Sequence, residues 1–298
     1  MKKLSGLIAA THTGFKPDGS VDLDIISRQA ELMVRQGVTG VYICGTTGEG
    51  ISCSVDERKA IMEEWTRVAR GKLFIIAHIG ALALPDVQSL AAFAQKVACD
   101  AVSIVPANYF KPGNVETLVD YCCEALKTAP DVPFYYYHTG MSGINLSMVK
   151  FLEVADKKIP QLAGIKFNSV DLYEYQNCLS ALDGKYDITY GVDEFFAGAV
   201  ALGAKSAIGS TYNYMAPFYS KIVRDLSAGN LDQVQSAMQK VCKVVDILVQ
   251  YGGVAAGKVM MMAHGLDLGD VRLPLRSISP EGKKDILERF EKLDVLGG

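Results

Sequence analysis

Short apolar runs alternate with longer amphipathic runs along most of this sequence. Nearly continuous hydrophobicity is typical of parallel strands that are covered on both faces. Eight runs fit that description: Gly6–Ala10, Gly40–Cys44, Phe74–Ile79, Ala101–Pro106, Pro133–His138, Gly164–Phe167, Ile188–Val192 and Ser206–Gly209. We therefore predict eight parallel strands.

The amphipathic runs between the strands predict helices. They are Ile25–Gln36, Val55–Arg70, Pro85–Ala98, Val115–Thr128, Ser147–Lys157, Leu172–Leu182, Glu194–Leu202 and Ala216–Ala228. Ser54 followed by Glu57 is the pattern of a capping box. Eight strand–helix units predict an α/β fold of the (β/α)8 TIM barrel type. The alternative is an open doubly wound sheet, but the residues after the first strand lack its glycine-rich fingerprint.

The pattern changes after Gly229, where no further strand is predicted. Helices are expected at Leu231–Tyr251, Val254–His264 and Pro280–Leu293. We predict a barrel catalytic region at residues 1–229 and a C-terminal helical extension, residues 230–298, packed on the barrel.

Composition narrows the possible functions. The 298 residues include 30 Lys and Arg against 33 Asp and Glu, which argues against nucleic-acid binding. Seven cysteines, an odd number without a C-x-x-C pair, indicate reduced and buried thiols in a cytoplasmic protein. No apolar run is long enough for a membrane span, and no signal peptide is expected at the N-terminus.

Active sites of such barrels lie at the carboxyl ends of the strands, so the polar residues there are the candidates for chemistry. Lys166 lies in the apolar run Gly164–Phe167. Burial lowers the pKa of a lysine and exposes a free amine that can attack a ketone to form a Schiff base. A lysine that reaches solvent at a strand end is the plainer interpretation.

Three other strand ends carry polar groups. Gly45–Gly50 forms a turn whose hydroxyls and amides suit a carboxylate or phosphate, although it is not a P-loop. Tyr137 ends the fifth strand and is the best candidate to relay a proton. Asp193 and Glu194 follow the seventh strand and can accept hydrogen bonds from sugar hydroxyls, or can simply cap a helix.

His12, His78 and His138 also fall at strand ends and raise the alternative of a metal-dependent hydrolase. Their wide separation and the lack of H-x-H or H-E-x-x-H patterns argue against it. We therefore predict no metal site.

Taken together, Gly45–Glu49, the fifth-strand tyrosine, Gly164-Ile165-Lys166 and Gly191-Val192-Asp193-Glu194 resemble one family. It is the pyruvate-dependent class I aldolase family of N-acetylneuraminate lyase and dihydrodipicolinate synthase. The resemblance extends from Leu4 to about Leu293. It implies reversible cleavage of N-acetylneuraminate to pyruvate and N-acetylmannosamine, in a homotetramer, without a cofactor or metal.

The resemblance also implies a role for each site residue. Lys166 would form the Schiff base, Thr46 and Thr47 would hold the carboxylate of pyruvate, and Tyr137 would transfer a proton at the cleaved bond. The polyol part of the sugar acid would be bound by Asn168, Gly191, Asp193, Glu194 and Ser210.

The choice of acceptor aldehyde rests on other positions. The synthase-like branch commonly has an arginine shortly after this tyrosine, whereas residues 138–143 contain none. An acidic pair at 193–194 also suits hydroxyls better than a second carboxylate. The short loop after Tyr137 and the amide Asn108 depart from the family pattern. The open alternatives are another 2-keto-3-deoxy sugar acid aldolase, dihydrodipicolinate synthesis, or a barrel that binds sugar acids without catalysis.

Overall fold

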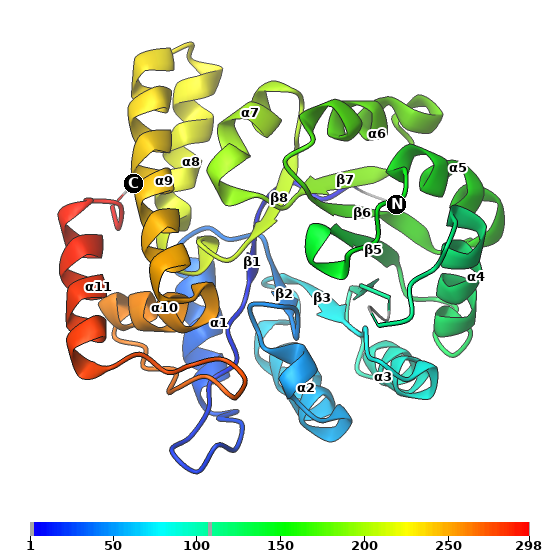
Figure 1. Cartoon of the computed structure of the whole chain (residues 1–298), viewed down its shortest axis with the longest axis horizontal. Coiled ribbons are helices and arrows are strands. Elements are labelled where there is room, and N and C mark those ends of the chain that lie inside the picture. The colour runs from blue at the N-terminus through cyan, green and yellow to red at the C-terminus, as the bar shows by residue number, and fades with distance from the viewer. Residues whose placement is uncertain (1–2, 107–108, 298) are drawn as a thin grey trace.

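A computed structural model describes residues 3–106 and 109–297 of the chain (Figure 1). Its eight strands pair in parallel and in chain order, and β1 also pairs with β8, which closes the barrel. The strands are β1 Gly6–Ala10, β2 Gly40–Ile43, β3 Phe74–His78, β4 Ala101–Ile104, β5 Phe134–Thr139, β6 Leu162–Asn168, β7 Asp187–Tyr190 and β8 Ser206–Gly209. The predicted (β/α)8 barrel is confirmed. Asn108, which departs from the family pattern, lies outside the described residues.

Helices follow the strands and cover the outside of the barrel. They are α1 Ile25–Arg35, α2 Val55–Ala69, α3 Leu84–Lys96, α4 Val115–Leu126, α5 Met148–Lys158, α6 Leu172–Gly184, α7 Phe196–Ala201 and α8 Tyr212–Ser227. Short 3-10 turns lie at Gly50–Ser52 (η1), Gly140–Ser142 (η2), Asp193–Phe195 (η3) and Met262–His264 (η4). The capping box of Ser54 and Glu57 at the start of α2 is confirmed.

The eighth helix begins at Tyr212, four residues before the predicted start at Ala216. Pro217 lies inside this helix, and Met215 has non-helical angles, so the first turn is offset from the rest. Because proline favours the beginning of a helix, the sequence pattern indicated a later start.

The C-terminal residues form α9 Leu231–Tyr251, α10 Gly253–Met261 and α11 Pro280–Lys292. Figure 1 shows these three helices on the side of the barrel where α8 lies, with α9 beside α8 and α11 farther out, against α9 and α10. The division into residues 1–229 and 230–298 stays our proposal. No single helix among the described residues is long and apolar enough to cross a membrane, although α9 and the α10–η4 segment, bent by 117°, pass that test as a pair.

Two apolar layers surround the strands. Side chains on the outer faces pack against the helices, and a smaller cluster fills the inside of the barrel. The inner cluster includes Tyr42, Tyr135 and Tyr137, whereas Tyr136 packs outside against Phe151. The alternation of the three consecutive tyrosines therefore places Tyr137 inside.

All seven cysteines are free thiols, as predicted. We predicted that all seven are buried. This prediction is wrong for two of them, because Cys123 is half-buried and Cys242 is exposed. Both lie on amphipathic helices, outside the buried face of each.

Candidate active site

A cavity of about 530 Å³ lies at the carboxyl ends of the strands. Strands β5 and β6 and the loops after β2, β7 and β8 supply most of its lining, and Val245 and Leu248 of α9 close one side. All the sequence-predicted site residues line this one cavity: Thr46, Thr47, Tyr137, Lys166, Asn168, Gly191, Asp193, Glu194 and Ser210.

Lys166 is directed into the cavity by an irregularity in β6. Phe134 pairs with Leu162, but the next residue of β5, Tyr135, pairs with Gly164, so Ala163 is the extra residue of a bulge. A bulge changes which side chains face inward. Gly164 lies so close to β7 that an added Cβ would be 1.7 Å from the carbonyl oxygen of Asp187. The glycine before Ile165-Lys166 thus lets the two strands approach.

The Lys166 amine lies between two aromatic rings. Its Nζ is 4.0 Å from the ring centroid of Tyr42 and 4.1 Å from that of Tyr137. Within the described residues, no carboxylate forms an ion pair with it. Burial lowers the pKa of Lys166, while Tyr137 and the more distant Asp193 partly oppose that shift. This environment favours a neutral, nucleophilic amine.

Tyr42 is a site residue that the sequence reasoning missed, because that reasoning considered only strand ends. It lies inside β2, donates a hydrogen bond to the Ser103 hydroxyl over 3.1 Å, and its ring meets the Tyr137 ring edge to face. Burial raises the pKa of Tyr42 well above its ordinary value. A tyrosine on the inward face of an apolar strand was the available signal.

The turn after β2 offers donors to an anion. Thr46 is exposed and Thr47 is half-buried at the cavity wall. Within the turn, the amides of Glu49 and Gly50 bond to Thr46 and Gly45 carbonyls, whereas those of Thr46, Thr47 and Gly48 bond to no described residue. Successive free amides with nearby hydroxyls form a concave anion site. The turn can therefore bind a carboxylate.

The two acidic residues after β7 differ in their surroundings. Asp193 is buried and accepts hydrogen bonds from the amide and hydroxyl of Thr211, at 3.0 and 2.7 Å. Burial raises the pKa of Asp193, and these two donors oppose the rise. Glu194 is half-buried at the cavity wall. The alternative interpretation of Asp193 as a helix cap is not seen, since its carboxylate accepts hydrogen bonds from Thr211 instead.

Asn168 and the three histidines complete the surroundings. Asn168 donates to the Thr139 hydroxyl over 3.2 Å. Burial lowers the pKa of His12 to about 3 and that of His78 well below its ordinary value. His138 packs against the Phe167 ring. Among the described residues, no group of three or more His, Cys, Asp or Glu side chains could hold a metal ion, so the metal-dependent alternative gains no support.

Comparisons with known proteins agree on one family. Residues 3–292 match the model of the dihydrodipicolinate synthetase family. The chain is 37% identical to N-acetylneuraminate lyase of Xenopus tropicalis over an alignment of 304 positions. The alignment covers 99% of this chain and 98% of that protein. Among solved structures, N-acetylneuraminate lyase (sialic acid aldolase) of Aliivibrio salmonicida is 50% identical, with a TM-score of 0.98 and 99% of each chain covered. The lyase of Proteus mirabilis is 49% identical, with a TM-score of 0.98, and 99% of this chain and 100% of that one are covered.

Proposed function

The chain belongs to the dihydrodipicolinate synthetase family, and we propose that it is a class I aldolase that reversibly cleaves N-acetylneuraminate to pyruvate and N-acetylmannosamine. One observation carries the mechanism. The Lys166 amine is buried and pairs with no carboxylate of the residues that the structure describes, at the wall of a cavity that it shares with Tyr137 and the turn after β2. A neutral amine beside a carboxylate-binding turn suits a 2-keto acid.

The steps follow from the chemistry of the imine. The Lys166 amine adds to the keto carbon of the open-chain sugar acid, and loss of water gives a protonated imine. Tyr137 relays the proton of the hydroxyl on the carbon that becomes the aldehyde: its phenolic oxygen accepts that proton while its own proton passes to the carboxylate of the substrate. The carbon–carbon bond then breaks, and its electron pair moves toward the imine to form an enamine. Protonation of the enamine carbon and hydrolysis of the imine release pyruvate.

The turn after β2 orients the substrate for this reaction. The hydroxyls and amides of Thr46 and Thr47 would bind the carboxylate next to the keto carbon, because they are uncommitted donors at the cavity wall. Holding the carboxylate fixes the keto carbon relative to Lys166, which lowers the entropic barrier to attack.

The opposite wall would bind the polyol. Asn168, Gly191, Asp193, Glu194 and Ser210 offer carbonyls, carboxylates, an amide and a hydroxyl in this part of the cavity. No arginine stands among the described lining residues, which favours a neutral sugar aldehyde over a second carboxylate. By the same family resemblance, we propose a cytoplasmic homotetramer that acts without a cofactor or metal.

Trapping with borohydride tests the reaction directly. N-acetylneuraminate is added, pyruvate release is measured, and the reaction is quenched with borohydride before peptide mapping by mass spectrometry. We expect pyruvate release and a reduced pyruvyl adduct on Lys166. An adduct from added pyruvate without cleavage of N-acetylneuraminate would move the substrate to another 2-keto-3-deoxy sugar acid. Release without any lysine adduct would refute the Schiff-base mechanism.

The polyol wall has its own test. Glu194→Ala should raise the half-saturating concentration of N-acetylmannosamine by about tenfold, the loss expected when good hydrogen bonds to a ligand are removed. The half-saturating concentration of pyruvate should not change. A larger effect on pyruvate than on the sugar would show that this residue faces the other substrate.

A further inference from the structure

The turn at residues 44–50 has a backbone that needs outside support. Cys44 at its start and Glu49 near its end both have positive φ angles, 57° and 52°, which non-glycine residues rarely adopt. Gly50 lies so close to Cys44 that an added Cβ would be 1.8 Å from the carbonyl oxygen of Cys44. Such a conformation persists only where the surrounding structure holds it.

The Glu49 side chain receives that support from the C-terminal helices. Its carboxylate is buried, forms an ion pair with Lys258 of α10 at 2.8 Å, and accepts the backbone amide of Arg272 at 2.8 Å. Lys258 also donates to the carbonyl of Asp270 at 3.0 Å. Both charged side chains are nearly inaccessible, at 3% for Lys258 and 1% for Glu49. A buried pair with further hydrogen bonds fixes one geometry.

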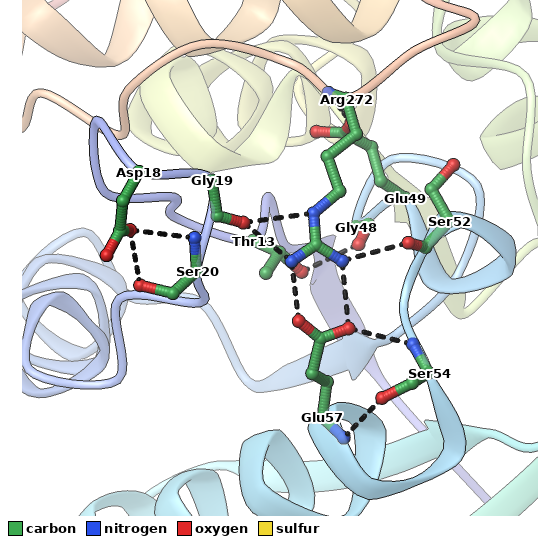
Figure 2. A network of polar contacts seen from close by, with 10 residues as sticks. All are labelled: Thr13, Asp18, Gly19, Ser20, Gly48, Glu49, Ser52, Ser54, Glu57 and Arg272. Carbon is green, nitrogen blue, oxygen red and sulfur yellow. Dashed lines mark hydrogen bonds and ion pairs between the residues drawn. The ribbon is translucent and has the colours of Figure 1, made fainter.

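Arg272 connects the other side of the same turn. Figure 2 shows its guanidinium reaching the Glu57 carboxylate and the carbonyls of Ser52 and Gly19. The contacts with Glu57 measure 2.5 and 2.8 Å. Those with Ser52 and Gly19 measure 2.9 and 2.7 Å. Glu57 in turn accepts the amide of Ser54 at the start of α2. One side chain thus ties the segment after the turn to the loop before α1.

Helix α10 also supports the turn through its contact with His12. Gly257 lies against His12, where an added Cβ would be 2.6 Å from the imidazole Cε1. The nearby Thr47 backbone partly offsets the lowering of the His12 pKa by burial and by Lys258. The ring is therefore neutral near pH 7 and acts as packing between α10 and the turn.

We propose that Glu49, Lys258 and Arg272 are positioning residues that hold the amides of Thr46, Thr47 and Gly48 ready for the carboxylate of pyruvate. This inference rests on the proposed function. None of the three lines the cavity that contains Lys166, so they act through the turn. Their contribution is preorganisation, because a turn already held in its binding conformation need not be ordered by the ligand.

The test measures pyruvate and sugar separately, in the synthetic direction. Lys258→Met and Glu49→Gln are compared with the unchanged protein by half-saturating pyruvate, half-saturating N-acetylmannosamine, kcat, and borohydride-trapped adduct. We expect half-saturating pyruvate to rise about tenfold in each variant, since small displacements of a binding group have effects of this size or more. The N-acetylmannosamine value and kcat should change less than threefold.

Asp187→Asn is the matched control. Asp187 is another buried carboxylate that accepts one backbone amide, from Leu4 at 2.9 Å, and one side-chain donor, Tyr135 at 3.1 Å. It lies at the start of β7, at the opposite end of the barrel from the turn. Its substitution should leave half-saturating pyruvate unchanged. An equal rise in this variant would mean that general loosening of the fold, rather than positioning, causes the effect.

A second pair of variants keeps the test decisive if a single charge removal prevents folding. The double variant Glu49→Gln with Lys258→Met removes both charges of the buried pair together. Arg272→Met alters a side chain that is 22% exposed. Either variant, once folded, should show the rise in half-saturating pyruvate.

The outcomes separate this inference from the proposed function. If the unchanged protein forms its adduct and the folded variants bind pyruvate equally well, the positioning role is wrong. If the unchanged protein forms no adduct, the proposed function fails first.

Discussion

Two buried lysines show how surroundings decide what an amine does. Lys166 lies inside the barrel and is 5% exposed, and Lys258 lies between α10 and the turn after β2 and is 3% exposed. Burial lowers the pKa of both. Glu49 opposes the shift for Lys258 through an ion pair at 2.8 Å, whereas Lys166 has two aromatic rings and a cavity in front of it.

The difference teaches that burial alone does not make a nucleophile. A carboxylate at contact distance keeps a buried ammonium charged and commits it to one partner. An amine without such a partner is easily deprotonated and, where a cavity adjoins it, meets substrate. The predictions below are ordered by the size of the expected effect, and each bears on this comparison.

Lys166→Ala should have the largest effect on turnover. Removal of the nucleophile should reduce kcat roughly ten-thousandfold. The fold should be kept, because the substitution breaks no ion pair of Lys166 with any residue that the structure describes. Steady-state pyruvate release and circular dichroism measure the two properties. Activity near that of the unchanged protein would remove Lys166 from the mechanism.

Tyr137→Phe should have the next largest effect. Loss of the hydroxyl removes the proton acceptor but retains the ring beside Lys166, so kcat should fall about 100-fold. The adduct trapped from pyruvate alone should still form. An unchanged kcat would exclude proton transfer by this tyrosine.

Lys258→Met should affect stability more than chemistry. A buried Glu49 carboxylate without its partner is expected to lower the free energy of unfolding by about 3 kcal/mol. Urea denaturation measures this change, and borohydride with saturating pyruvate should still label Lys166. If labelling disappears in the folded variant, Lys258 takes part in the covalent step and the contrast between the two lysines fails.

The pH dependence of adduct formation is the smallest effect. Because burial lowers the Lys166 pKa from 10.5, the amine becomes half neutral at a pH below 10.5. The rate of trapping by borohydride at fixed pyruvate should therefore rise with pH, with its midpoint below that value. Lys258→Met should leave this midpoint unchanged within about half a pH unit. A midpoint at or above pH 10.5 would mean that the amine is not perturbed.

Most of the fold could be predicted because the strands are covered on both faces. Gly6–Ala10 and Ser206–Gly209 have the predicted bounds. The sixth strand begins at Leu162, two residues before its predicted start at Gly164. The bulge at Ala163 explains this difference, because an extra residue interrupts the periodic pattern on which the prediction relies.

The residues of the candidate site could be predicted because a barrel brings the carboxyl ends of its strands together. That rule, with the family resemblance, identified the residues that line the cavity, whose roles remain predictions. The rule could not identify Lys258, because α10 follows no strand. Its partner Glu49 is more than 200 positions away, and only the tertiary fold places the two charges in contact.

The contacts of Arg272 have a consequence for how the molecule is built. Arg272 meets Glu57 and Glu49 across 215 and 223 positions of the chain. A ribosome completes the strands of the barrel before it makes α10 or residue 272. The turn after β2 is therefore synthesised early but acquires its last partners late, so that folding of the proposed pyruvate site must wait for nearly the whole chain.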